Sequence, residues 1–265
     1  MRHFRCPSKE LPFQAACLCL RTPTQSRDSL SCWAGSTSAA SAIPRQSVLP
    51  PQIRRLHQGD AGLGRAVLSA ENEARCRRTL EPNMAAYEKE RAKGKAKEGQ
   101  RGWAAVLVSL CLVGGEPAFL FTLRSNTLKG RHKGDVRGKQ DPSDRDVVDT
   151  ALREACEELG VAVAVSSVWG VLKPLRDMSG MLVAPVLANL GPLENLSFRP
   201  NPSEVEEIFT ISLAHLCSPK NRGYTNFRVG DRYGYTLPVF RNGKHRVWGL
   251  TAVALDHTLK IIAPP

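Results

Sequence analysis

Apolar residues form two long runs in the middle of the chain, at 104–112 and 118–123. Runs of this kind are typical of buried strands. Gly114-Gly115 lies between them and predicts a turn, so the two runs are expected to pair as a hairpin. Shorter apolar runs at 168–172 and 181–187 predict two more strands.

Three features nearer the C-terminus refine this pattern. Pro185 cannot donate a ladder hydrogen bond, which favours an edge position for its strand. The segment 202–209 is polar at first and then apolar, and we interpret it as a helix start that packs Ile208 and Phe209 inward. The stretch 248–259 predicts a closing helix. Strands combined with packed helices predict an α/β fold with a mixed sheet.

A helical period appears between 141 and 160. Asp141 is the predicted N-cap, Pro142 suits the first helical position, and Gly160 is placed to end the helix in the left-handed conformation. One face of this helix is expected to pack on the core, because apolar residues recur along it at helical spacing. These residues are Val148, Leu152, Ala155 and Leu159.

Three carboxylates lie to one side of that apolar stripe. Glu154 and Glu158 are one helical turn apart with Glu157 between them, so their side chains can converge on one face. Like charges there repel and weaken an isolated helix. Two interpretations are open: an ordinary solvated acidic face, or a site where Mg²⁺ or Mn²⁺, which prefer oxygen ligands, sits between the carboxylates.

The spacing around these carboxylates resembles the signature of the Nudix hydrolase family. That signature is a glycine, a glutamate further on, and then Arg-Glu-aliphatic-x-Glu-Glu-x-Gly-aliphatic. The stretch 138–161 matches it, with Asp144 in the first glutamate slot, an additional residue before Arg153, and Ala155 in the first aliphatic slot. The resemblance implies an α/β/α sandwich and a metal-dependent hydrolase.

The segment before this signature resembles the upstream motif of coenzyme A-cleaving members of the family. It reads Leu120-Phe121-Thr122-Leu123-Arg124-Ser125, followed by Gly134-Asp135-Val136. The resemblance extends from about 68 to 264. It implies hydrolysis of the diphosphate bond of coenzyme A or its thioesters, which yields 3′,5′-adenosine diphosphate and 4′-phosphopantetheine or its acyl form.

The resemblance also implies a metal site and a catalytic pair. The metal, Mg²⁺ or Mn²⁺, is expected to bind Glu154, Glu157, Glu158 and the carbonyl of Gly138. Arg153 is expected to orient a carboxylate by a charge-assisted hydrogen bond. Glu157 is one candidate to accept the proton of the attacking water. The alternatives for that proton are Glu204, Glu206 and Glu207.

Basic residues before the signature are the candidates for binding the phosphates of the substrate. For each of them, an ordinary surface role is the alternative. These residues are Arg124, Lys129, Arg131 and Lys133, of which Lys129 stands where the family usually has arginine.

One departure from the family pattern falls on the loop before the carboxylate helix. Family members have Phe-Pro-Gly-Gly-Lys where this chain has Val136-Arg137-Gly138-Lys139, so the loop is shorter. Glycines there let backbone approach a phosphate. We expect a distorted turn at Arg137-Gly138 and lowered activity, with the helix kept in place. Two other functions stay open: a Nudix diphosphatase of nucleoside diphosphate derivatives, and an inactive nucleotide-binding Nudix module.

The composition of the N-terminal segment indicates where in the cell the protein acts. The chain has 265 residues and a formal net charge of +12. Its first 60 residues are rich in Arg and Ser, poor in acidic residues and interrupted by Pro50-Pro51, which is typical of a mitochondrial transit peptide. Plain disorder is the alternative. A phosphate-rich substrate would also favour basic residues, so the charge does not require a nucleic acid partner.

We therefore expect a disordered or transit-peptide-like extension at 1–60, a charged and partly helical connector at 61–100, and a Nudix domain at 101–265. No apolar run approaches the ~20 residues that span a bilayer. The eight cysteines are dispersed, which fits a reduced compartment, and Cys156 is expected to pack beside the apolar stripe. A small-molecule substrate, no specific nucleic acid, no membrane, and a monomer or weak dimer are expected.

Overall fold

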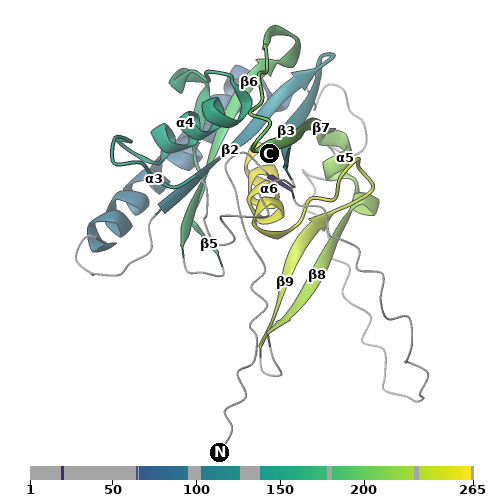
Figure 1. Ribbon diagram of the computed structural model, residues 1–265. Helices are drawn as coiled ribbons and strands as arrows, with labels where there is room; N and C mark the ends of the chain where they lie inside the picture. The colour runs from purple at the N-terminus through teal and green to yellow at the C-terminus, as the bar shows by residue number, and fades with distance from the viewer. Residues whose placement is uncertain are drawn as a thin grey trace, which may run out of the picture.

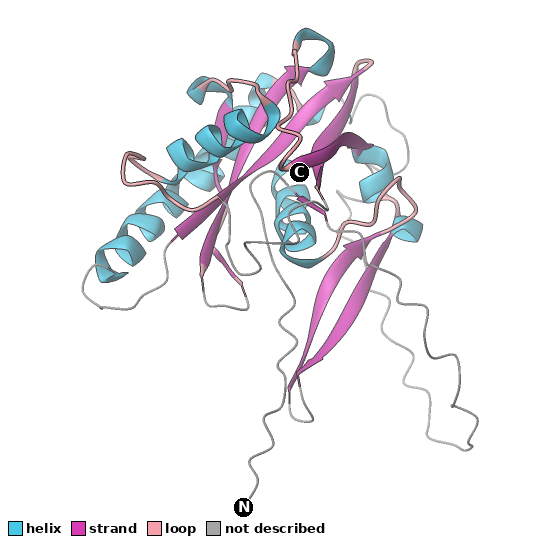
Figure 2. Cartoon of the chain, in the orientation of Figure 1, coloured by secondary structure: helices cyan, strands magenta, loops and turns pink. Residues whose placement is uncertain are grey.

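A mixed sheet lies between helices that cover both of its faces, as the ribbon views show (Figures 1 and 2). This arrangement confirms the predicted α/β sandwich. The structure is a computed structural model, and of the extension at 1–60 it describes β1 (Cys19–Leu20). The described residues are 19–20, 64, 66–94, 103–125, 138–177, 181–229 and 233–263.

Six further strands build the main sheet with β1: β2 (Trp103–Val113), β3 (Glu116–Arg124), β4 (Val168–Val171), β5 (Leu175–Arg176), β6 (Leu182–Pro192) and β7 (Val205–Ser212). Their order is β1-β3-β2-β6-β4, with β7 also beside β3 and β5 beside β6. The pairs β2–β6 and β1–β3 are parallel, and the others are antiparallel.

The longer helices are α3 (Ala70–Gly94), α4 (Val147–Leu159) and α6 (Gly249–Ile262), and the last of them confirms the predicted closing helix. None of the helices in the described ranges is long and apolar enough to cross a membrane. A separate hairpin, which the sequence pattern did not predict, extends away from the main sheet (Figure 1). The remaining elements are η2 (Val165–Ser167), η3 (Leu193–Asn195), α5 (Leu213–Cys217), η4 (Pro219–Asn221), β8 (Arg222–Val229) and β9 (Tyr233–Phe240).

The predicted central hairpin is confirmed as β2 and β3. Gly114 and Gly115 have φ angles of 55° and 83°, which glycine adopts without strain, and they form the turn. Pairing between the two strands stops at Ser109 and Leu120. Beyond that point the strands separate, and the start of β2 pairs with the loop around Lys139 through an isolated bridge.

The expectation that Pro185 lies on an edge strand is wrong. Its strand, β6, is internal, because β2 pairs with one side of it while β4 and β5 pair with the other. The ladder on that second side is interrupted between Val171 and Leu175, and Pro185 lies opposite the interruption. Its carbonyl accepts a hydrogen bond of 2.8 Å from Leu172 N. A proline is tolerated there because the gap between β4 and β5 does not need its missing donor.

The helix start expected at 202–209 is also wrong. This segment forms β7, which pairs with β3 along its length. Val205, Phe209 and Ile211 are buried at odd positions, which is the period of a strand with one face on the core. The acidic residues between them are those that suggested a polar helix start.

Helix α4 begins later than predicted. Its N-cap is Asp146, whose side chain accepts hydrogen bonds from Val148 N and Asp149 N at 2.8 and 2.9 Å. The expected N-cap, Asp141, instead closes a local turn with Ser143. The predicted end is confirmed, because Gly160 has a φ of 66° and is the C-cap.

The buried face of α4 is rotated from the predicted stripe. Val148 and Leu152 are only half-buried, and Cys156 is exposed, so the expectation that Cys156 packs beside the stripe is wrong. Of the predicted stripe, Ala155 and Leu159 are fully buried, and Val148 and Leu152 pack on the core in part. One residue step turns a helix by about 100°, and the observed face is turned by part of that step, toward Val147 and Ala151. Its fully buried apolar residues are Val147, Ala151, Ala155 and Leu159.

Helix α3 covers much of the segment expected to be a charged connector. Cys76 and Leu80 pack in the same cluster as α6, whereas Tyr87 packs in the cluster beneath α4. The helix therefore runs past the β4 edge of the sheet and contributes to both layers. It approaches β4 closely at Gly170, which has a φ of 149° and where a Cβ would lie 2.6 Å from Leu80 Cβ.

Two polar side chains of α3 hold the end of α6. Asn72 Nδ2 donates to the carbonyls of Ile262 and Val67, each at 2.9 Å. Arg75 donates to Asn72 Oδ1 at 2.8 Å and to the Ile261 carbonyl at 2.6 Å. The last carbonyls of a helix have no partner within it. We call these contacts the α3–α6 clamp, and they supply those partners from a helix that lies far away in the sequence.

Candidate functional site

The loop before α4 is fixed to the first residues of β2. Ala105 N donates to the Gly138 carbonyl at 2.8 Å, and Gln140 N donates to the Trp103 carbonyl at 2.9 Å. Gly138 has a φ of 82°, a conformation that favours glycine. Its N–H is directed at the Glu154 carboxylate, with which it forms a hydrogen bond. The loop and the carboxylate helix are therefore joined at Gly138.

Arg153 is the centre of a network of acidic groups. Its Nη1 lies 2.8 Å from Glu154 Oε1 and 3.1 Å from Glu157 Oε2. Its Nε and Nη2 each lie 3.1 Å from an oxygen of Asp144, which is a bidentate pairing. Nη2 also donates to the Lys139 carbonyl at 2.9 Å. Arg153 therefore contacts three carboxylates at once, and its role in orienting one of them for catalysis stays a prediction.

Asp144 is a buried anchor for that network. It also accepts hydrogen bonds of 2.9 Å from Thr150 Oγ1 and from Asp141 N. Burial raises the pKa of its carboxyl, but the hydrogen bonds from Arg153, Asp141 and Thr150 outweigh burial and hold that pKa below its ordinary value. Asp144 therefore fills the glutamate slot of the signature as an anion. Thr150 was missed from the sequence, although a polar residue on the buried face of α4 is a usable signal.

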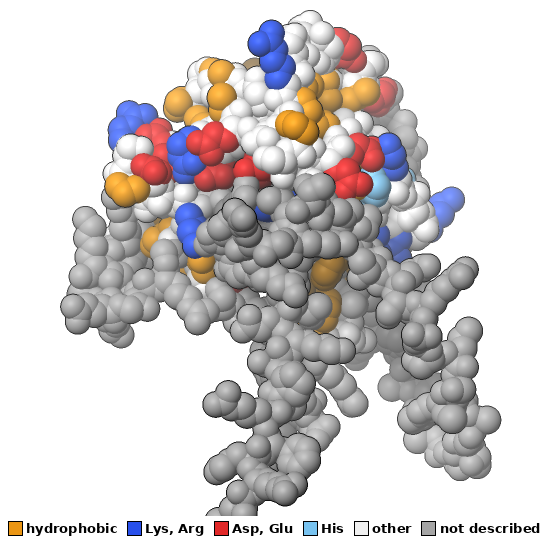
Figure 3. Space-filling view, viewed as in Figure 1, with side chains coloured by type: hydrophobic (Ala, Val, Ile, Leu, Met, Phe, Trp, Pro, Cys, Tyr) orange, Lys and Arg blue, Asp and Glu red, His pale blue; other side chains and the backbone are white. Residues whose placement is uncertain are grey.

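The three glutamates differ strongly in exposure. Glu154 and Glu158 are 8% and 1% exposed, whereas the side chain of Glu157 is 56% exposed. An ordinary solvated face therefore does not describe Glu154 and Glu158. Burial, opposed by Arg153, raises the pKa of Glu154 above its ordinary value. On the face shown in Figure 3, acidic and basic side chains lie in contact over α4.

A divalent ion suits these residues chemically, because carboxylate oxygens are the donors that Mg²⁺ and Mn²⁺ prefer. Within the described parts of the chain, however, no group of three or more His, Cys, Asp or Glu side chains stands in a metal-binding arrangement. The Arg153 guanidinium contacts both Glu154 and Glu157. An ion that bridges these two carboxylates therefore has to replace one of those contacts.

The other predicted binding residues fall into three groups. The carbonyl of Gly138 already accepts from Ala105, and its metal contact stays a prediction. Arg124, at the end of β3, is 5% exposed, so a phosphate has little access to it as it stands. The remaining three, Lys129, Arg131 and Lys133, lie outside the described residues.

Of the alternative proton acceptors, Glu207 has its own partners. Its carboxylate pairs with Lys244 and lies 3.1 Å from His245 Nε2. His245 in turn packs on Phe209, which belongs to the core cluster on the α6 side of the sheet. The Lys244 contact, followed by that of His245, lowers the pKa of Glu207. These contacts direct Glu207 away from the α4 carboxylates.

Comparison with known proteins identifies the family. No family model matches the chain. A mouse protein named mitochondrial coenzyme A diphosphatase NUDT8 is 54% identical over 200 residues, which cover 74% of this chain and 90% of that protein. A Photorhabdus laumondii protein named uncharacterized Nudix hydrolase NudL is 36% identical over 165 residues, or 61% of this chain and 84% of that protein.

This chain therefore belongs to the Nudix hydrolase family, whose members generally need a divalent metal ion. A crystal structure of a MutT/Nudix family protein from Enterococcus faecalis covers 67% of this chain and 62% of its own, at a TM-score of 0.36 and 14% identity. That likeness is too low to carry an argument.

Proposed function

We propose that this protein hydrolyses the diphosphate bond of coenzyme A and of acyl-coenzyme A, and releases 3′,5′-adenosine diphosphate and (acyl-)4′-phosphopantetheine. The observation that carries the proposal is the 54% identity, over 74% of the chain, to a protein named mitochondrial coenzyme A diphosphatase. The carboxylates of α4 supply a matching chemistry, because a diphosphate is an anion that a bound divalent ion neutralises.

Glu154, Glu157 and Glu158 would hold Mg²⁺ or Mn²⁺, which lowers the pKa of a bound water and polarises the diphosphate. The three residues are not equivalent in this role. Glu154 and Glu158 are buried and fixed on the packed side of α4, so they suit permanent ligands. Glu157 is exposed, and it suits either a ligand that is recruited with the substrate or the group that accepts the proton of the water.

Arg153 would hold the Glu154 carboxylate in its ionised form and in a fixed position. In the structure it contacts Glu154 and Glu157 together. Once Glu157 turns to an ion or a water, Arg153 still has its bidentate contact with Asp144 and its contact with the Lys139 carbonyl. It can therefore hold Glu154 in place without following Glu157. Asp144 is a positioning residue in this scheme, because it acts through Arg153.

The remaining features of the proposal concern the cellular location of the enzyme, its oligomeric state and its partners. The extension at 1–60 would direct it to mitochondria, which agrees with the name of the mouse relative. The predicted Nudix domain at 101–265, together with α3 that packs on it, would act on a small-molecule substrate as a monomer or weak dimer, without a specific nucleic acid or membrane partner. The basic residues at 129, 131 and 133 would bind the phosphates, and Arg124, which is 5% exposed, would have to become more accessible to join them.

The test uses the purified full chain with Mg²⁺ or Mn²⁺ and identifies the products by mass spectrometry. We expect coenzyme A to be cleaved faster than dephospho-coenzyme A, ADP-ribose or a sugar nucleotide. The variants Glu154→Gln and Glu158→Gln should lower the rate at least ~10²-fold, about 2.7 kcal/mol in the barrier. The exposed Glu81→Gln is the matched control and should retain the rate.

The same assay separates the alternatives. Equal or faster cleavage of ADP-ribose in competition would favour a Nudix diphosphatase of other nucleoside diphosphates. Binding of coenzyme A without turnover at saturating Mn²⁺ would favour an inactive nucleotide-binding module. Near-normal turnover in both glutamine variants, with circular dichroism unchanged, would remove these residues from the catalytic role.

A further inference from the structure

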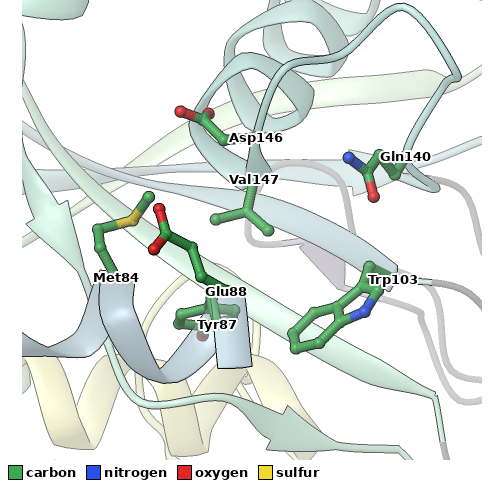
Figure 4. Close-up of a pocket in the computed structure, with 7 residues that line it drawn as sticks. All are labelled: Met84, Tyr87, Glu88, Trp103, Gln140, Asp146 and Val147. Atoms are coloured by element: carbon green, nitrogen blue, oxygen red, sulfur yellow. The ribbon is translucent and has the colours of Figure 1, made fainter. Parts of the chain in front are cut away.

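A hollow lies beside the loop that carries Gly138. It is enclosed by the second half of α3, the first residue of β2, the loop before α4 and the first turn of α4 (Figure 4). The hollow is shallow, because its volume of about 310 Å³ includes the solvent at its open mouth, and the enclosed part is far smaller. At most one flat ring could enter it, and a whole coenzyme could not. The lining residues are Met84, Tyr87, Glu88, Trp103, Gln140, Asp146 and Val147.

Two measures place this hollow next to the α4 carboxylates. Val147 and Glu154 are seven positions apart, so they share a helix face and are separated by about 10 Å along the axis. On the other side, Trp103 pairs with Gln140, and Ala105 pairs with Gly138 two residues further along the same ladder. Two residues of a strand span about 7 Å. A ribose spans a gap of this size between a diphosphate and its base.

The interior of the hollow is aromatic and apolar. The rings of Tyr87 and Trp103 lie 5.3 Å apart at 53° to each other. The Tyr87 hydroxyl donates to the Leu172 carbonyl at 2.8 Å, which fixes its ring. Val147 and Met84 complete the apolar surface, as Figure 4 shows. Trp103 is half-buried, so its ring offers a flat face to a partner that stacks.

The rim of the hollow is polar and acidic. Asp146 is already the N-cap of α4, and the side chain of Gln140 lies 3.4 Å from the Asp144 carbonyl. Glu88, on the exposed side of α3, brings a carboxylate to the mouth (Figure 4). A carboxylate accepts hydrogen bonds only, so it recognises an amino group and rejects a carbonyl oxygen at the same place.

We propose that this hollow binds the adenine ring of the substrate, with the base stacked on Trp103 and its exocyclic amino group donating to Glu88. The inference rests on the proposed function, because it takes the α4 carboxylates as the place where the diphosphate binds. A simple organic cation could also be attracted by Glu88 and an aromatic face. The short distance to Gly138 and Glu154 favours a base that is attached to the diphosphate.

Calorimetry of adenosine 3′,5′-bisphosphate binding to the full chain tests the inference without turnover. Stacking of a base on an aromatic side chain is worth about 1–3 kcal/mol, so Trp103→Leu should weaken binding about 10-fold. Trp248→Leu, another half-buried tryptophan on a different element, is the control and should bind normally. Ribose 3,5-bisphosphate, which lacks the base, should bind the unaltered chain and Trp103→Leu equally.

Glu88→Gln is a surface change that tests the amino contact separately. The unaltered chain should prefer adenosine 3′,5′-bisphosphate to the inosine compound, and Glu88→Gln should reduce that preference several-fold. Equal binding of the adenosine and base-free compounds, or displacement by tetramethylammonium alone, would overturn the inference. If coenzyme A is not cleaved but the base still binds through Trp103, the proposed function fails and the base site stands.

Discussion

The α3–α6 clamp can be tested by a single substitution, Asn72→Ala. Asn72 is 5% exposed, donates to two buried carbonyls and accepts from Arg75. A buried carbonyl left without its donor costs about 1–3 kcal/mol, and a lost hydrogen bond to an exposed or re-paired group costs about 1 kcal/mol. Two carbonyls at the low end of that range and the Arg75 contact together give about 3 kcal/mol. Arg75 keeps its contact with the Ile261 carbonyl, which limits the damage. We expect a loss of about 3 kcal/mol in the free energy of unfolding.

For a domain of this size, 1 kcal/mol changes Tm by about 2–4 °C, so Asn72→Ala should lower Tm by about 6–12 °C. Thermal unfolding followed by circular dichroism measures this directly. Asn195→Ala, an exposed asparagine of η3, is the matched control and should leave Tm almost unchanged. A drop no larger than that of the control would refute the reasoning, since it would mean that the clamp adds nothing to the stability of the fold.

Three further predictions concern the ends of the domain, its thiols and its short loop. Removal of residues 1–60 deletes only the two-residue strand β1 from the described sheet and should leave the rest of the fold and the activity intact, whereas removal of 1–100 deletes α3 and should abolish cooperative unfolding in a melting experiment. In the 61–265 chain, iodoacetamide at pH 8 should label Cys156, which is exposed, far faster than Cys76, Cys111 and Cys217, as read by peptide mass spectrometry. Burial raises the pKa of Cys111 and of Cys217 to about 12, so their reactive thiolate is scarce; equal labelling would contradict the buried positions. Insertion of Phe-Pro-Gly before Gly138, with Ser in place of Arg137, should raise turnover several-fold at saturating Mn²⁺ and coenzyme A; if the short form is already as fast, the loop does not limit the enzyme.

Elements with one dominant local signal were predicted well. The β2–β3 hairpin followed from two apolar runs and Gly114-Gly115, and the end of α4 followed from Gly160. In both cases the residues that decide the structure are neighbours in the sequence. The α/β sandwich followed from the same runs, because so much apolar surface can be buried only between layers.

Elements decided by distant partners were predicted poorly. The start of α4 was misplaced, because Asp141 and Asp146 are equally good N-caps locally. The pairing of Asp144 with Arg153 holds the preceding segment as a turn. Strand β7 was missed because its acidic residues suggested a helix start, and only the edge of β3 makes it a strand. Neither partner is visible from local spacing.

In the candidate site too, features set by local sequence could be predicted, and features set by distant segments could not. The signature positions of Glu154, Glu157 and Glu158 could be read from the sequence, and whether they are the metal ligands stays a prediction. Their very different exposures could not be read, because burial depends on how α4 rests on the sheet. The hollow at Trp103 was not foreseen, since its walls come from segments that local spacing does not connect.

The α3–α6 clamp also constrains the order in which the molecule can be completed. Asn72 and Ile262 are 190 positions apart, so the contact cannot form until all of the residues between them have been synthesised and have left the ribosome. Closing so long a loop has an entropic cost that local helices do not carry, and contacts of this separation slow folding. Until then, the faces of α3 that bear Cys76 and Leu80 have no α6 to cover them. While α6 is still to be synthesised, the nascent protein therefore exposes an apolar surface on α3, and a chaperone that shields α3 would act at the stage where this chain is most prone to aggregate.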